Sequence, residues 1–233
     1  PLKRESTAEQ TQLSSCLYDI LCRMAWGRPY GAGRNMKSDG STETTSVRRE
    51  GPKRSEASRQ AILSAAREEL IEHGWRSFSP DRLSRRAKAS KQTVYRWWPS
   101  VAAIAIDAAI SMIDEPVIKP EEPVDVQLAA FIEPFSELAR VGDGAHLLRS
   151  ALLAASDDPA AGEIFRTWFN NTIRKPMKNV LAQAASKGRI RRDYDPDAVC
   201  ETLFGAVWHR LILMRGPLPH VLAMKSAQAV LAS

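Results

Sequence analysis

Long hydrophobic runs are missing from this sequence. No stretch of its 233 residues approaches the roughly 18 uncharged apolar residues of a membrane-spanning helix. Lys3 and Arg4 lie near the start, but Asp19 interrupts the apolar segment behind them, so a secretory signal peptide is not indicated. We therefore predict a cytoplasmic protein that makes no contact with a membrane.

Cysteine and histidine are scarce, with three and four residues respectively. They are Cys16, Cys22, Cys200, His73, His146, His209 and His220. They include neither the closely spaced pairs of a zinc site nor an H-E-x-x-H motif. We predict no metal, no cofactor, and free thiols in a reducing compartment.

Catalytic motifs are also lacking. Asp157 and Asp158 form a carboxylate pair, but they precede a predicted helix, where acidic residues favour the helix dipole. Ser150 and Ser156 have no G-x-S-x-G setting, and G-A-G-R at 31–34 is too short for a dinucleotide-binding loop. Since no useful strand alternation and no repeat occurs either, we predict an all-α protein that is not an enzyme.

What the sequence does contain is the segment S-P-D-R-L-S-R-R-A-K-A-S-K-Q-T-V-Y-R-W-W-P-S at 79–100. Ser79 can cap a helix that has Pro80 at its first position, and Ser90 can cap a second helix. Val94 and Trp98 lie four residues apart and share one face of that second helix, and Pro99 ends it. The spacing predicts a helix-turn-helix whose second helix reads DNA.

The segment and its flanks resemble the TetR family of bacterial transcription regulators. The resemblance covers residues 59–100, including R-Q-A-I-L-S-A-A-R-E-E-L-I-E-H-G-W, which is similar to the first helix of that family. Matching positions in the second part are Ala87, Ser90, Thr93, Tyr95, Trp98, Pro99 and Ser100. The resemblance implies an N-terminal three-helix DNA-binding domain and a C-terminal helical domain that binds a ligand and forms a dimer.

Two positions depart from the family pattern. Lys88 stands where the family usually has a glycine in the turn, and a left-handed residue other than glycine costs roughly 1 kcal/mol. Val101 replaces a lysine that usually contacts a phosphate. We expect a slightly altered turn and the loss of that one contact.

Charge is unevenly distributed along the chain. Residues 47–100 hold thirteen Lys and Arg against six Asp and Glu, a net charge of +7, whereas residues 101–233 carry −2. A solvated basic face would explain the charge alone. Together with the capped helices, the excess of cations favours a module that displaces counterions from DNA.

We assign the predicted DNA contacts by chemistry. Gln92 and Thr93 are expected at base edges, and Lys91 at a base or a phosphate. Tyr95 and Arg96 should hold phosphates, while Trp97 either packs on the DNA backbone or covers the fourth helix. The remaining predicted contacts are Ser79 and Ser90 at the helix starts, and Lys53 and Arg54 in the basic arm.

Residues 1–52 are predicted to be a disordered extension, and the basic arm R-R-E-G-P-K-R at 48–54 leads from it into the first helix. The chain opens with Pro1, and we hypothesise that Met36 is the natural start. Intact-mass analysis of the protein made from the native locus tests this. A mass that includes residues 1–35 would contradict it.

The rest of the chain reads as helices. We predict a first helix at about 55–73, with Trp75 and Phe78 packing under the helix-turn-helix. The DNA-binding domain spans 53–100, and the C-terminal domain spans 101–233. Further helices are expected at 101–114, 125–141, 145–156, 158–185, 195–215 and 219–231. Pro134 and Pro176 should kink or break the two helices that contain them.

The C-terminal domain carries two further predictions. By the resemblance, a small effector binds there, and the mostly apolar candidate side chains indicate an apolar or aromatic molecule. The candidate lining residues, which could equally form plain core, are Phe131, Phe135, Trp168, Phe169, Met177 and Trp208. The last two helices have broad apolar faces, and pairing them with a second copy would make a homodimer that places two recognition helices in successive major grooves.

These features predict a sequence-specific transcriptional regulator that binds a double-stranded DNA operator, as a repressor released by its effector. Lys88 and Val101 motivate an alternative, an all-α small-molecule-binding or interaction protein whose DNA-binding head has lost function. The operator, the effector, the regulated genes and the sign of regulation are not encoded in any recognisable pattern.

Overall fold

The structure is a computed structural model that describes residues 51–140, 142–190, 193–219 and 221–232, and side chains from residue 56 onward. These residues form helices and loops with no strand among them, as predicted. The chain falls into two compact units, one ending at Gln60 and one beginning at Ala61. The packing described below is that of the second unit. The predicted disordered extension, the start at Met36 and two of the cysteines lie outside the described residues.

The first described helix, α2, spans Gly51–His73. The predicted start near residue 55 is therefore wrong, and Lys53 and Arg54 belong to the helix instead of an extended arm. Pro52 explains the difference, since proline is tolerated in the first turn of a helix and presets its backbone angle. Gly74, with a φ of 69°, follows the C-terminal end of α2, as predicted.

Two short helices follow the 3₁₀ turn η1, Trp75–Ser77. Helix α3 spans Pro80–Arg86 and α4 spans Lys91–Trp97, which confirms the predicted helix-turn-helix. Leu83 and Val94 are fully buried, and Trp98 behind α4 is fully buried as well. Leu63 and Leu70 of α2 are buried as well, so all three helices supply buried apolar side chains.

Ion pairs reinforce this core from its edge. Glu69 of α2 is only 3% exposed, and its carboxylate lies 2.9 Å from Arg86 Nε and 3.2 Å from Arg82 Nε. Arg86 also donates to Glu72, and its Nη1 lies 3.3 Å from a Glu68 oxygen. Since both arginines lie on α3, these carboxylates of α2 set the position of α3.

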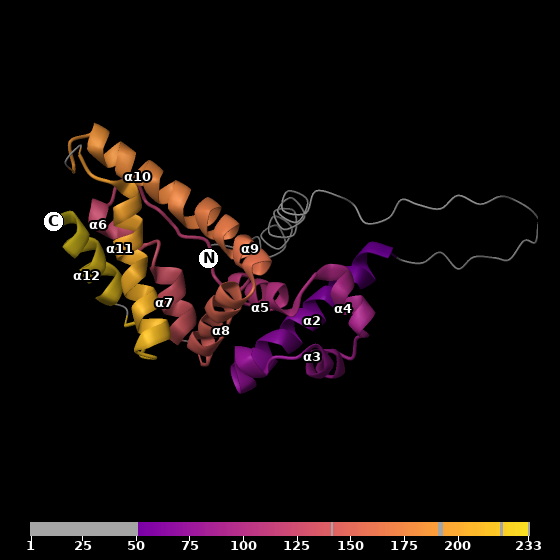
Figure 1. The fold of residues 1–233 in the computed structure, drawn as a ribbon. Coiled ribbons are helices and arrows are strands. Elements are labelled where there is room, and N and C mark those ends of the chain that lie inside the picture. The colour runs from indigo at the N-terminus through magenta and orange to yellow at the C-terminus, as the bar shows by residue number, and fades with distance from the viewer. Residues whose placement is uncertain (1–50, 141, 191–192, 220, 233) are drawn as a thin grey trace, which may run out of the picture. The chain divides into compact units, whose positions relative to one another are not determined.

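Helix α5 spans Val101–Ile110 and is buried along almost its whole length. Ser100 caps it by accepting from Ala103 N–H at 3.2 Å. The indole of Trp98 donates to the buried carboxylate of Asp107 at 2.8 Å. The end of the recognition helix is therefore tied to α5, which packs along α8 in the C-terminal part of the chain (Figure 1).

Proline breaks the next predicted helix. In place of one helix at 125–141, the structure has α6, Val124–Ala129, and α7, Glu133–Arg140, with Pro134 at the start of the second. Helix α8 then spans Gly144–Asp157. A Cβ on Gly144 would lie 1.9 Å from the Leu138 carbonyl oxygen, so only glycine allows α8 to start this close to α7.

The predicted kink or break at Pro176 takes the form of a π-helical turn just before the proline. Helix α9, Pro159–Phe169, runs into the π turn η2, Asn170–Arg174, and then into α10, Lys175–Ser186. Proline cannot donate the i→i−4 hydrogen bond, and a π turn just before it accommodates that loss. A second π turn, η3, His209–Leu213, continues α11, Pro196–Trp208, and has no proline next to it.

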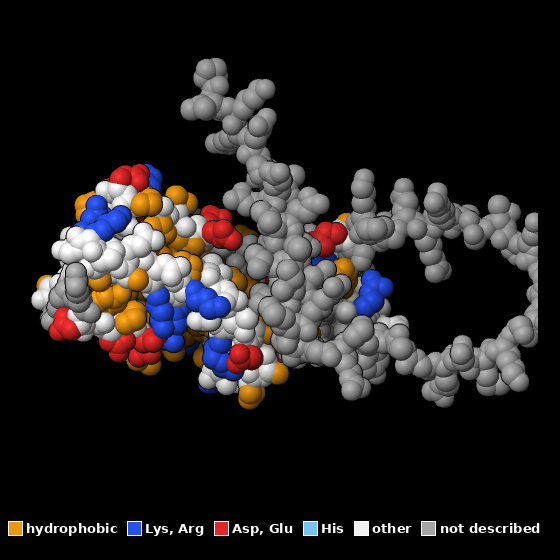
Figure 2. All heavy atoms as spheres, turned by 90° about the horizontal axis from the view of Figure 1, so that it is seen from above, with side chains coloured by type: hydrophobic (Ala, Val, Ile, Leu, Met, Phe, Trp, Pro, Cys, Tyr) orange, Lys and Arg blue, Asp and Glu red, His pale blue; other side chains and the backbone are white. Residues whose placement is uncertain are grey.

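The chain ends with α12, Val221–Ala232, which lies beside α11 and α6 (Figure 1). On the face drawn in Figure 2, hydrophobic side chains reach the surface among charges of both signs. Within the described ranges, no helix is both long enough and apolar enough to cross a lipid bilayer.

Candidate nucleic-acid interface and effector site

The recognition helix α4 is built by its own caps. Ser90 Oγ accepts from Thr93 N–H at 3.1 Å and lies 2.9 Å from Thr93 Oγ1. Val94 and Trp98 occupy the buried face, as their spacing predicted. The Ser90 cap thus fixes the start of the helix, and Val94 and Trp98 anchor its buried face.

The opposite face of α4 is open to solvent. Lys91, Gln92, Tyr95 and Arg96 are exposed, and Tyr95 has 45% of its surface accessible. A face with an ammonium, an amide, a phenol and a guanidinium can contact both base edges and phosphates. The structure therefore brings four of the predicted DNA contacts together on one surface.

Thr93 and Trp97 are partly buried. The Trp97 indole nitrogen is inaccessible and has no hydrogen-bond partner, and the Arg96 guanidinium lies 5.9 Å from the Trp97 ring centroid. The indole can therefore hold the Arg96 side chain by a cation–π contact. For Trp97, both predicted roles remain open.

The turn before α4 tolerates the missing glycine. Lys88 has a φ of 50°, in the left-handed region. Ala89 N–H still reaches the Ser84 carbonyl at 3.0 Å, and Lys88 N–H reaches that of Arg85 at 3.3 Å. These two bonds make a Schellman motif, so the turn has regular geometry and the substitution leaves only local strain.

The remaining predicted contacts lie at helix starts. Ser79 Oγ accepts from Arg82 N–H at 3.3 Å, which confirms the predicted cap. Lys53 and Arg54 lie in the first turns of α2, in the unit that precedes Ala61. Their contact with DNA stays a prediction.

Sequence reasoning missed how the head is joined to the C-terminal helices. Ser100 Oγ donates to Asp158 Oδ2 at 2.9 Å, while Asp158 Oδ1 caps α9. Trp75 donates to Asp157 at 2.7 Å, so its indole faces the end of α8, whereas Phe78 is buried as predicted. The carboxylate pair thus links the starts of α5 and α9, which no local pattern indicated.

Four of the predicted effector residues meet in one aromatic cluster, which we define as Phe135, Phe165, Trp168, Phe169, Phe204 and Trp208. Ring centroids lie 4.8 Å apart for Phe169 and Phe204, and 5.3 Å apart for Phe135 and Phe204. Phe131 and Met177, the other two candidates, are fully buried in the same core. All six predicted effector residues therefore lie in or against one apolar core.

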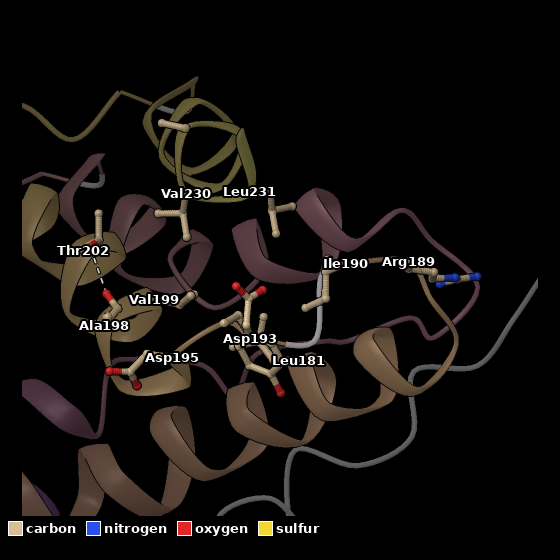
Figure 3. Close-up of a pocket in the computed structure, with 12 residues that line it drawn as sticks. Leu181, Arg189, Ile190, Asp193, Asp195, Ala198, Val199, Thr202, Val230 and Leu231 are labelled. Atoms are coloured by element: carbon tan, nitrogen blue, oxygen red, sulfur yellow. Dashed lines mark hydrogen bonds between the residues drawn. The ribbon is translucent and has the colours of Figure 1, made fainter. Parts of the chain in front are cut away.

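A separate open-mouthed cavity of about 850 Å³ lies where the end of α10, the start of α11 and the end of α12 meet (Figure 3). Its walls include Leu181, Ile190, Val199 and Leu231, and Figure 3 shows the Asp193 carboxylate among them. None of the predicted effector residues lines this cavity.

Burial and hydrogen bonds shift the pKa values of titratable groups in the C-terminal part. Burial raises the pKa of the Cys200 thiol, which opposes formation of a reactive thiolate. A hydrogen bond from Lys178 is the main cause that lowers the pKa of Asp197. Among the described side chains, no group of three His, Cys, Asp or Glu residues is arranged to hold a metal ion.

Comparison with known proteins agrees with this architecture. Residues 62–108 match the family described as bacterial regulatory proteins of the tetR family, and residues 121–230 match the tetracyclin repressor-like C-terminal domain. The uncharacterized HTH-type transcriptional regulator YdeS of Bacillus subtilis is 29% identical over 165 residues, which are 70% of this chain and 82% of YdeS. A second HTH-type regulator, Mb1581 of Mycobacterium bovis, is 29% identical over 150 residues, 64% of this chain and 73% of its own.

Solved structures share the fold as well. The crystal structure of the TetR family transcription regulator SCO0332 superposes with a TM-score of 0.55 and 27% identity, covering 75% of this chain and 97% of that one. The two family matches cover the helix-turn-helix and the helices behind it. The chain therefore belongs to the TetR family of transcriptional regulators.

Proposed function

We propose that the protein binds a double-stranded DNA operator through α4 and represses transcription until a small apolar effector releases it. One observation carries the DNA-binding part: α4 buries Val94 against the head and exposes Lys91, Gln92, Tyr95 and Arg96 on its other side. A capped helix with this division matches the recognition helix of a helix-turn-helix. Since bacterial DNA lies in the cytoplasm, the protein would act there.

We assign base reading to Gln92 and Thr93. An amide can make a bidentate contact with adenine, and a threonine offers both a hydroxyl and a methyl group. Phosphate contacts come from Tyr95, Arg96 and the capped helix starts at Ser79 and Ser90, with Lys53 and Arg54 adding charge. This division predicts that substitutions of Gln92 alter sequence preference, whereas those of Arg96 weaken binding to every sequence.

Dimerisation follows from the exposed apolar residues around the last two helices. Leu213, Met214 and Val221 are 72%, 62% and 51% exposed, an unusual exposure for large apolar side chains. They lie at the end of η3 and the start of α12. We propose that a second copy covers them, and that the dimer spaces its two recognition helices by about 34–36 Å, one turn of DNA.

Effector binding is assigned to the aromatic cluster. Three helices, α7, α9 and α11, supply its rings, and Ser136 beside Phe135 has a fully buried hydroxyl with no hydrogen-bond partner. Apolar walls with one such hydroxyl suit a small aromatic molecule that offers a single polar group. The cluster includes Phe165 and Phe169 of α9, whose N-terminal cap Asp158 is bonded to Ser100.

This connection supplies a mechanism for release. A ligand that shifts α9 changes the position of Asp158, and with it Ser100 at the end of the helix-turn-helix. DNA and effector then favour different arrangements of the two heads, and each weakens binding of the other by about 1–3 kcal/mol.

An electrophoretic mobility shift with DNA from upstream of the protein's own gene tests the proposal. We expect tight binding that weakens steeply with salt, and a loss of about 1–3 kcal/mol per recognition helix for Gln92→Ala. Gln183→Ala, the same change at an exposed position on α10, serves as the control. Loose binding to every sequence, unchanged by Gln92→Ala, would instead support the alternative of a head that has lost its function.

The effector assignment needs its own measurement. Trp168 and Trp208 report on the cluster by fluorescence, and indole is a suitable probe of a small aromatic site. We expect indole-type compounds to change this fluorescence and to release DNA, and expect Phe169→Ala to weaken both effects together. Release that persists unchanged in Phe169→Ala would place the effector elsewhere, with the cavity of Figure 3 the next site to examine.

A further inference from the structure

One ion pair joins the two helices of the helix-turn-helix on their exposed side. Lys91 Nζ, at the first position of α4, lies 2.5 Å from Asp81 Oδ1, at the second position of α3. Their side chains are 54% and 67% exposed, so both remain accessible to a ligand. A hydrogen bond from Lys91 is the main cause that lowers the pKa of Asp81, which keeps this carboxylate ionised well below neutral pH.

Asp81 is unusual by its place in the chain. It is the only acidic residue between Glu72 and Asp107, in a segment that carries Arg76, Arg82, Arg85, Arg86, Lys88, Lys91 and Arg96. Three other carboxylates of the head, Glu68, Glu69 and Glu72, lie on α2 and bind arginines of α3, whereas Glu56 pairs with Arg59 within α2. Asp81 alone places a negative charge against the recognition helix.

The pair has a plain structural explanation, which is incomplete. An exposed ion pair contributes little to stability, and an acidic residue at a helix start already interacts well with the helix dipole without any lysine. Neither effect accounts for a carboxylate at the surface that is proposed to meet a polyanion. The Asp81 carboxylate repels phosphates and therefore opposes DNA binding. A role in DNA binding would explain its presence on this surface.

We propose that Asp81 is a specificity-determining residue that keeps Lys91 from binding the phosphates of non-operator DNA. This inference rests on the proposed function and names a further residue in it. Non-specific binding comes almost entirely from cations that displace counterions at phosphates. A lysine already neutralised by a carboxylate gains little from a phosphate, so Asp81 lowers affinity for every sequence.

Operator binding is less affected by the same pair. A lysine ammonium has three donors, so Lys91 can donate to Asp81 and to a guanine edge at once. Base-edge contacts therefore keep their contribution while phosphate contacts lose theirs. Specificity is a difference between two affinities, and a repulsive group that weakens the wrong complex more than the right one increases it.

The test uses Asp81→Asn, Lys91→Met and the double variant of the full-length chain. Each is titrated with operator DNA and with a shuffled duplex of equal length and composition over a series of salt concentrations. We expect Asp81→Asn to tighten binding to the shuffled duplex about fivefold and to operator less than twofold, with a salt dependence steeper by about one counterion. In the Lys91→Met background, the same change should alter either affinity less than twofold.

Two controls separate this role from folding and from general charge. Asp81→Glu retains the carboxylate and should keep the wild-type preference for operator. Glu121→Gln removes one negative charge from an exposed residue between α5 and α6, and should leave the preference unchanged. Thermal unfolding of each variant shows whether it is folded at the assay temperature.

Several outcomes would overturn the inference. One is an Asp81→Asn variant that binds shuffled DNA no better than wild type. Another is equal tightening with and without Lys91, because Asp81 would then be only a repulsive charge. The proposed function fails separately, if wild-type protein shows no preference for any operator, whereas the inference fails if that preference exists and Asp81→Asn leaves it intact.

Discussion

The DNA-binding head and the C-terminal helices are stabilised in different ways. In the head, α3 and α4 have seven residues each, and each begins at a serine cap. Glu69 and the arginines of α3 add ion pairs. In the C-terminal part, the aromatic cluster and a continuous apolar core hold longer helices together.

This difference matches the two tasks. A recognition helix must present a few polar groups in one fixed orientation, and caps and ion pairs are directional interactions that provide it. An effector site must instead accept a ligand among apolar side chains, where contacts are numerous and less directional. In this chain, polar contacts orient the recognition helix, and apolar burial supplies most of the stability of the C-terminal part.

Removing an aromatic ring from the cluster should have the largest effect on stability. Phe204 is 2% exposed and contacts the rings of Phe135, Phe169 and Trp208. We expect Phe204→Ala to lower the free energy of unfolding by about 3–5 kcal/mol, and Phe204→Leu by about 1 kcal/mol. Urea denaturation measures both changes, and operator affinity of the folded fraction should stay within about twofold. A loss of affinity in the folded fraction would contradict the division between orientation and stability.

Removing a cap from the head should show the opposite pattern. Ser90→Ala is expected to cost about 1 kcal/mol of stability, because Thr93 N–H loses its acceptor, and to reduce operator affinity more than tenfold. Asp195 caps α11 in the same way, accepting from Asp197 N–H at 2.8 Å. Asp195→Ala should cost a similar amount of stability with no effect on DNA binding. Equal losses of operator affinity in the two variants would contradict the proposed distinction between helix orientation and stability.

The same contrast explains what the sequence could and could not predict. The bounds of α3 and α4 follow from Ser79, Pro80, Ser90 and Pro99, whose effects on the backbone are local. A proline indicates only that a helix is disturbed, so no spacing indicated the π turn at 170–174 before Pro176, and no local residue indicated the one at 209–213.

Contacts between distant residues escaped prediction for the same reason. Ser100 and Asp158 are 58 positions apart, and their hydrogen bond follows from the packing of α5 against α8 and α9. The Asp81–Lys91 pair is predictable from the sequence in principle, since both residues belong to one short motif. The predicted arm at Lys53 and Arg54 is wrong because the helix already begins at Gly51, with Pro52 in its first turn.

A glycine at the turn before α4 should stabilise the head without changing the C-terminal part. Lys88 is exposed and has a φ of 50°, a region that costs a residue other than glycine about 1 kcal/mol. We expect Lys88→Gly to raise the free energy of unfolding by about 0.5–1 kcal/mol. Lys187→Gly, the same substitution after α10 at a residue with negative φ, should give no gain. A destabilised Lys88→Gly variant would show that the lysine side chain stabilises the turn.

Acid should have the smallest effect, because the ionised pairs concerned are exposed and screened by solvent. Hydrogen bonds from Arg86 and Lys178 are the main causes that lower the pKa values of Glu72 in the head and Asp197 in the C-terminal part. A carboxyl whose pKa is lower in the folded state stabilises the fold above its unfolded-state pKa, near 4, and loses this contribution as the pH falls further. The melting temperature should therefore fall modestly between pH 5 and pH 3.

The two carboxyls can be separated by substitution. Glu72→Gln and Asp197→Asn should each flatten this dependence of the melting temperature on pH, and 0.5 M salt should reduce the difference between variant and wild type. Since α3 depends on carboxylates of α2, whereas α11 is also held by the aromatic cluster, acid should increase hydrogen exchange in α3 before α11. Simultaneous exchange of both helices would mean that the head and the C-terminal part unfold as one unit despite their different stabilisation.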